Sequence, residues 1–185
     1  MYTPAFFNAV PAIVVADALA KTLGAADDGL IEYRYVDAVK LAGHSCPTVA
    51  GAWLMTRAAL ARLYPGETPR RGEIRVELRQ RADEDVAGVI ASVASLVTGA
   101  ANEGGFKGLA GRFARQGLLR FGVAMSGEIR FTRLDNGRSV ELSHRPQMVP
   151  RPAGLGDKLR DALAPQASAA AKRAFTDAWQ GWVDR

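Results

Sequence analysis

The chain has 185 residues, of which 48% are hydrophobic, and is therefore long enough to bury a sizeable core. Its 24 basic and 19 acidic residues give a net charge of +5 but are interspersed, so no basic tract predicts a nucleic-acid surface. No apolar run has the length needed to span a bilayer, the opening residues lack the positive start of an export signal, and one cysteine excludes an internal disulfide. We expect a cytoplasmic protein that binds neither nucleic acid nor membrane.

The first third of the chain contains three predicted elements. Apolar residues recur at roughly helical spacing through 4–24, which predicts a helix broken at Pro11. Residues 31–41 are rich in Tyr and Val with a two-residue period, which predicts a strand. Residues 47–64 predict a second helix, because proline suits a first helical turn and a Pro-Gly pair follows the segment.

The middle of the chain alternates between strand and helix patterns. Apolar and charged residues alternate without error through 73–79, which predicts a strand with one face in the core. Residues 84–98 predict a third, largely apolar helix. A glycine-rich, basic stretch at 104–117 predicts a loop.

Three closing strands are expected near 118–125, 127–134 and 139–142, and we expect them to be antiparallel. The last two are joined at Asp135-Asn136-Gly137, because Asn-Gly favours a tight hairpin. Three prolines within 144–152 predict a linker.

The tail is predicted to be helical at about 167–183, with Phe175, Trp179 and Trp182 on one face. Such an aromatic stripe usually docks on its own domain or on a partner subunit. The order of elements predicts an α+β fold, with helices packed on an antiparallel or mixed sheet and a C-terminal helical extension. We assign residues 1–143 to the core domain and 144–185 to the linker and helix.

The segment Gly43-His44-Ser45-Cys46-Pro47 carries the clearest chemistry. Proline at the first helical position places Cys46 at or beside the helix cap, where the helix dipole stabilises a thiolate. The imidazole of His44, two residues earlier, adds a nitrogen donor, and nitrogen with sulfur suits zinc, copper or iron. The simpler interpretation is that both are packing residues, since two donors do not complete a metal site.

These residues resemble the FmdE-like family, which is named after a small subunit of formylmethanofuran dehydrogenase and includes stand-alone bacterial relatives. The family signature is a Gly-His-x-Cys-Pro turn before a small-residue-rich helix, here residues 43–51, and the resemblance extends over roughly 35–142. It implies an α+β core, a homodimer, and a metal, usually zinc, bound through His44 and Cys46.

The chain departs from the family pattern in two places. Many relatives carry further cysteines where this chain has Val89 and Ala100, and some end in a cysteine-rich zinc finger that this chain replaces with its linker and Trp-bearing helix. An incomplete metal site, or one shared between two copies of the chain, is therefore expected. No catalytic residue can be assigned, and whether the protein is an enzyme stays undecided.

Alternative ligands and sites remain open. A haem-binding or haem-handling protein could use the same His/Cys turn as an axial ligand, and the turn could also be vestigial in a structural subunit. Lys107, Arg112 and Arg115 of the glycine-rich loop are candidate contacts for a small anionic ligand or cofactor, although a mobile surface loop is the simpler interpretation. His144 is expected to be a solvated side chain.

Overall fold

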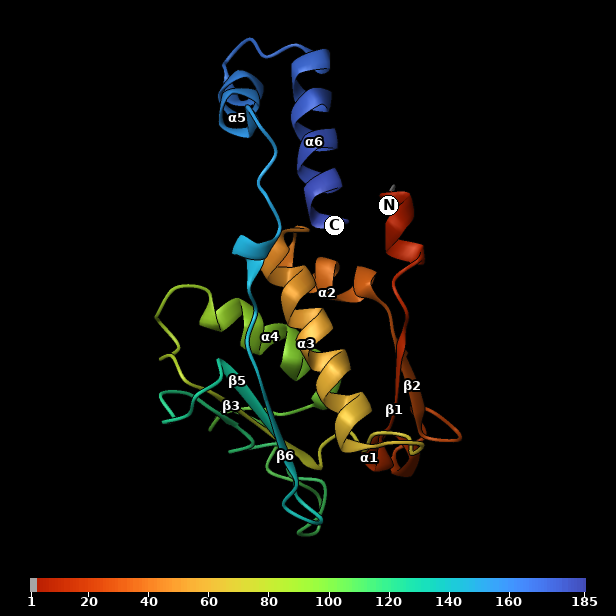
Figure 1. Ribbon diagram of the computed structural model, residues 1–185. Helices are drawn as coiled ribbons and strands as arrows, with labels where there is room; N and C mark the ends of the chain where they lie inside the picture. The colour runs from red at the N-terminus through yellow and green to blue at the C-terminus, as the bar shows by residue number, and fades with distance from the viewer. Residues whose placement is uncertain (1–2) are drawn as a thin grey trace.

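The computed structural model describes residues 3–185, and its helices and two sheets form the expected α+β fold (Figure 1). The elements in chain order are a 3-10 turn η1 (Ala5–Asn8), β1 (Ile13–Ala16), α1 (Ala18–Thr22), β2 (Leu30–Tyr33), α2 (Tyr35–Ala42), α3 (Pro47–Leu63), β3 (Ile74–Leu78), α4 (Ala87–Thr98), β4 (Leu119–Arg120), β5 (Ile129–Arg133), β6 (Ser139–Leu142), a 3-10 turn η2 (Pro146–Met148), α5 (Leu155–Leu163) and α6 (Ala169–Val183).

The larger sheet is mixed, with the strand order β4-β3-β5-β6. β5 is antiparallel to both β3 and β6. β5 and β6 form the expected hairpin, which turns near Gly137, a residue with a φ of 74°. β4 instead runs parallel to β3 and is only two residues long, so the prediction of three antiparallel closing strands is wrong for β4. Parallel pairing depends on a long connection and leaves no local turn signal in the sequence.

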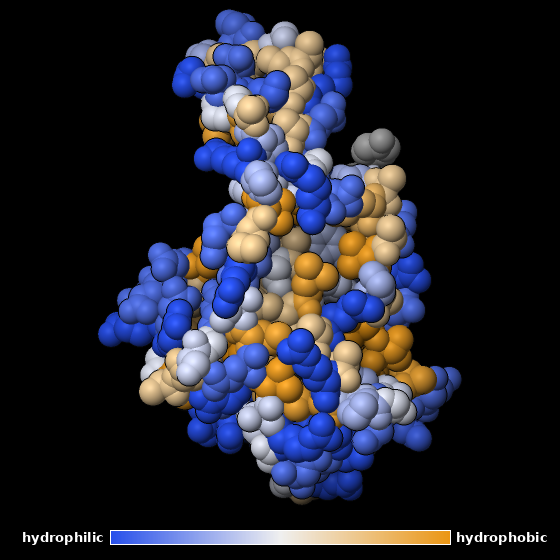
Figure 2. Space-filling view, viewed as in Figure 1, coloured by the Kyte–Doolittle hydropathy of each residue, from blue (hydrophilic) through white to orange (hydrophobic). Residues whose placement is uncertain are grey.

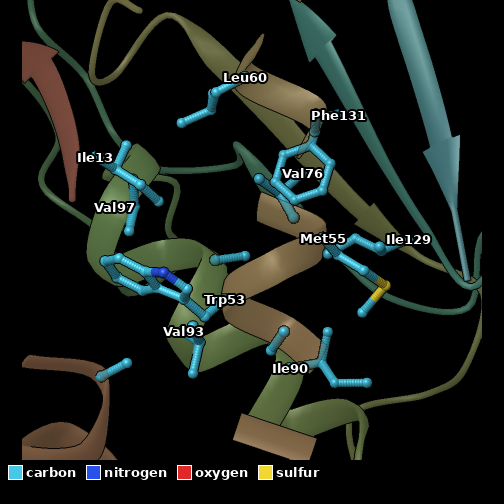
Figure 3. Close-up of a cluster of buried hydrophobic side chains, with 14 of the residues drawn as sticks. Ile13, Trp53, Met55, Leu60, Val76, Ile90, Val93, Val97, Ile129 and Phe131 are labelled. Carbon is cyan, nitrogen blue, oxygen red and sulfur yellow. The ribbon is translucent and has the colours of Figure 1, made fainter. Parts of the chain in front are cut away.

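The core lies between this sheet and the crossed helices α3 and α4, which pack on one of its faces (Figure 3). Trp53 of α3 points toward Val93 and Val97 of α4, and Phe131 and Val76 close the sheet side. All five side chains are completely buried. The predicted helix 47–64, helix 84–98 and strand 73–79 are thus confirmed as α3, α4 and β3.

The predicted helix over residues 4–24 is wrong. β1 pairs with β2 in a small antiparallel sheet between the turn η1 and the short helix α1. Pro11 lacks the backbone N–H that a continuous helix needs, and the β-branched residues after it alternate in burial, with Ile13 and Val15 buried and Val14 exposed.

The predicted strand over residues 31–41 ends early, because β2 stops at Tyr33 and α2 follows at once. The Asp37 side chain accepts a hydrogen bond of 2.9 Å from the backbone N–H of Arg34 and so caps the start of α2. The buried residues Tyr35, Ala38 and Val39 follow helical spacing, so the two-residue alternation in the sequence is coincidental.

The tail forms a helical hairpin, α5 and α6, that stands away from the core and touches it through the C-terminal end of α6 (Figure 1). α6 confirms the predicted helix near 167–183, whereas α5 was not predicted, and the linker contains the single turn η2. No helix among residues 3–185 combines the length and apolar character needed to cross a membrane.

Candidate functional site

The turn Gly43–Pro47 joins α2 to α3, not a strand to a helix as the sequence suggested. Gly43 ends α2 with a φ of 74°, a left-handed conformation that favours glycine. Pro47 is the first residue of α3, and Cys46 is its extended N-cap residue. Cys46 therefore lies at the N-terminal end of a 17-residue helix, the positive end of the helix dipole.

His44 is exposed, and its ring is held by a hydrogen bond of 2.9 Å between Nδ1 and the carbonyl oxygen of Ala42. Because a carbonyl can only accept, Nδ1 carries a proton, and in the neutral ring the lone pair is then on Nε2. Beside the ring lies a shallow cavity of about 190 Å³ between the end of α2 and one face of α4, lined mostly by apolar side chains. The hydrogen bond thus orients the imidazole and makes Nε2 the atom that a neutral ring would offer to a ligand.

Ser45 fixes the turn from both sides. Its hydroxyl forms a hydrogen bond of 2.9 Å with the Tyr35 hydroxyl, and its carbonyl accepts a hydrogen bond of 2.8 Å from the Trp179 indole of α6. Burial raises the pKa of Tyr35 above its usual value, and the nearby Cys46 adds to the increase, so Tyr35 stays protonated. Tyr35 thus contacts the turn, whereas Tyr33 lies beneath the Arg71 guanidinium.

The described part of the chain brings no third donor to this turn. Nowhere in residues 3–185 do three or more His, Cys, Asp or Glu side chains gather as a metal-binding group. His44 and Cys46 would supply at most one nitrogen and one sulfur, half of a tetrahedral shell, and the remaining positions would need water, a ligand or a second chain.

The three cations of the glycine-rich loop do not converge. Lys107 and Arg112 are exposed, whereas Arg115 is buried and donates a hydrogen bond of 2.8 Å to Asp17. Arg115 thus anchors the loop to the start of α1 and is occupied by a carboxylate of its own chain. Neither the sequence spacing nor the loop composition signalled this pairing, which spans 98 positions.

His144 was expected in solvent but lies half-buried against α3. Its ring occupies the space where a side chain of Gly51 would be, and its backbone N–H donates to Glu128 over 2.9 Å. Burial lowers the pKa of His144 below its usual 6.5, although the Glu128 charge partly opposes the decrease. The glycine in the middle of α3 was the available sequence signal for this close approach.

The lowered pKa of His144 has a measurable consequence for stability. Below pH about 6.5 the unfolded chain binds a proton at this position more readily than the folded chain does. The contribution of the neutral His144 ring to the free energy of unfolding is therefore lost as the pH falls. We expect His144→Gln to reduce the loss of stability between neutral and mildly acidic pH, measured by urea unfolding at each pH. An unchanged pH profile would show that His144 titrates alike in both states.

Comparison with protein-family models, with curated proteins and with solved structures found no match.

Proposed function

We propose that this protein binds a divalent metal ion, zinc being the first candidate, through His44 Nε2 and the Cys46 thiolate. The single observation that carries the proposal is the hydrogen bond from His44 Nδ1 to the Ala42 carbonyl, 2.9 Å long. An imidazole that ligates a metal commonly donates its other N–H to a carbonyl or carboxylate, which fixes the tautomer and the ring.

Cys46 supports the same role. It is the N-cap residue of α3, two positions after His44, and its sulfur is the kind of donor that zinc accepts. The clamp on Ser45 from Tyr35 and Trp179 holds the residue between the two donors. When bound, zinc would supply a Lewis acid and a site with open positions.

The chain supplies two donors, so we propose that a second copy of the chain or a small ligand completes the shell. The resemblance to the FmdE-like family favours the second copy, because that family implies a homodimer. Sedimentation with and without zinc distinguishes the two cases. A zinc-dependent dimer supports a shared site, and a zinc-loaded monomer supports completion by water or a small ligand.

The decisive experiment measures metal content and the absorption spectrum of the freshly purified protein. We expect stoichiometric zinc, and we expect Cys46→Ser and His44→Ala each to lower zinc affinity by roughly 10- to 100-fold or more, as for removal of a ligand or its support. With cobalt in place of zinc, a thiolate-to-cobalt charge-transfer band should appear in the natural chain and be absent from Cys46→Ser.

His144→Gln is the matched control, because His144 is the other of the chain's two histidines and packs at Gly51 on α3. It should retain zinc. Zinc binding that survives Cys46→Ser unchanged would contradict the proposal, and a Soret band in place of zinc would assign the turn to haem.

A further inference from the structure

A groove runs along the exposed side of α3, separate from His44 and Cys46. It encloses about 330 Å³, within the range of small-molecule sites. Figure 2 shows apolar residues gathered on this face around α3. The lining comes from α3, from the segment that follows β6 and from the end of the chain.

The two ends of the groove differ in character. The segment at 145–149 and the C-terminal end of α6 lie beside the first turns of α3 (Figure 1) and bring Arg145 and Arg185 there. Toward the other end the lining consists of Met55, Ala58 and Leu142. No aspartate or glutamate side chain is among the lining residues of this groove, and Arg145 and Arg185 make its side-chain charge positive.

Side-chain packing and a hydrogen bond fix the walls of the groove. Gly51 admits the His144 ring, which forms the side of the groove, and the neutral form of that ring makes the wall weakly polar. The Trp182 indole donates a hydrogen bond of 3.3 Å to the Val149 carbonyl and so ties α6 to the opposite wall. Leu54, at the rim, leaves 55% of its surface exposed.

We propose that the groove binds a free medium-chain carboxylic acid, with the carboxylate at Arg145 and Arg185 and the alkyl chain along α3. A guanidinium recognises a carboxylate through charge-assisted hydrogen bonds, and the apolar lining removes the alkyl chain from water. The carboxylate head and apolar tail of this ligand match the cationic and apolar ends of the groove.

The test uses decanoate and the full chain. Titration followed by calorimetry and by tryptophan fluorescence should give one site per chain, with Trp182 reporting occupancy from the groove wall. Decylamine, which has the same tail and the opposite charge, should bind at least about tenfold more weakly, and Arg145→Gln should weaken decanoate by about tenfold. Ala58→Phe should fill the apolar end and abolish binding while leaving the circular dichroism spectrum unchanged.

The matched control is Arg151→Gln, an exposed arginine of the same linker that does not line the groove; it should leave binding unchanged. Equal affinity for decanoate and decylamine, or an unaltered affinity in Arg145→Gln, would overturn the proposal. The proposal would also be overturned if the protein bound no decanoate and formed a dimer that Leu54→Arg converted to monomers. A second copy of the chain would then cover the groove. The outcome does not depend on zinc, since neither His44 nor Cys46 lines this space.

Discussion

Replacing Asp17 with Asn is expected to destabilise the fold by roughly 3–5 kcal/mol, the loss typical of removing one partner from a buried ion pair. Asp17 is 3% exposed and accepts hydrogen bonds from two guanidiniums, from Arg71 over 2.9 Å and from Arg115 over 2.8 Å. It also caps α1 through the backbone N–H groups of Leu19 and Ala20. An amide at this position would leave the buried Arg115 and the half-buried Arg71 without a counter-charge, and its own N–H donors would face one of the two guanidiniums.

The loss measured by chemical unfolding should depend on pH. Burial opposes ionisation of Asp17, but the hydrogen bonds and charges of the arginines outweigh it, so its pKa lies below the usual 3.8. A depressed pKa means that its contribution is complete above the unfolded-state value and is lost as the pH falls through the folded-state value. The difference between the natural chain and Asp17→Asn should therefore narrow in acid.

Asp157→Asn provides the matched control, because Asp157 pairs with Arg160 over 3.0 Å but both side chains are largely exposed. Exposed pairs of this kind contribute less than about 1 kcal/mol. Adding Arg115→Met to Asp17→Asn should cost less than the sum of the single changes, since it removes one of the uncompensated cations. Strict additivity would contradict the proposed coupling.

The parts of the fold that the sequence predicts well have local causes. α3 is marked by Pro47 at its start and a Pro-Gly pair after its end, and β3 is marked by unbroken alternation. The N-cap position of Cys46 follows from the same proline, so the central part of the candidate site is readable from five consecutive residues. These signals need no information from the rest of the chain.

The features that the sequence did not predict depend on distant partners. β1 is a strand because β2 pairs with it, and β4 is parallel because the loop after α4 returns to β3. Arg115 pairs with a carboxylate 98 positions away, and the His144 ring fits against Gly51 across the sheet hairpin. From the sequence, Arg115 was expected to be a loop cation and His144 a surface histidine. The sequence could not predict their burial, because tertiary packing decides which side chains are buried.

The second large effect is expected at Trp53. Trp53 belongs to α3, and its side chain is fully buried. The centroids of the Trp53 and Tyr35 rings lie 6.2 Å apart in an edge-on arrangement. Trp53→Ala should cost about 3–5 kcal/mol, because a large cavity would form in a packed core. Since the Tyr35 hydroxyl is bonded to Ser45, the cavity should also loosen the turn that carries His44 and Cys46.

Trp53→Phe separates packing from hydrogen bonding at this position. The buried indole Nε1 finds no acceptor within residues 3–185, so phenylalanine removes an unpaired donor while keeping most of the aromatic contact. We expect it to lose much less stability than Trp53→Ala in urea unfolding, and to retain zinc where Trp53→Ala binds it more weakly. Equal losses of stability in the two variants would contradict this expectation. The ring contact that Trp53→Phe keeps would then contribute little, and the edge-on contact with Tyr35 would not be the feature that holds the turn.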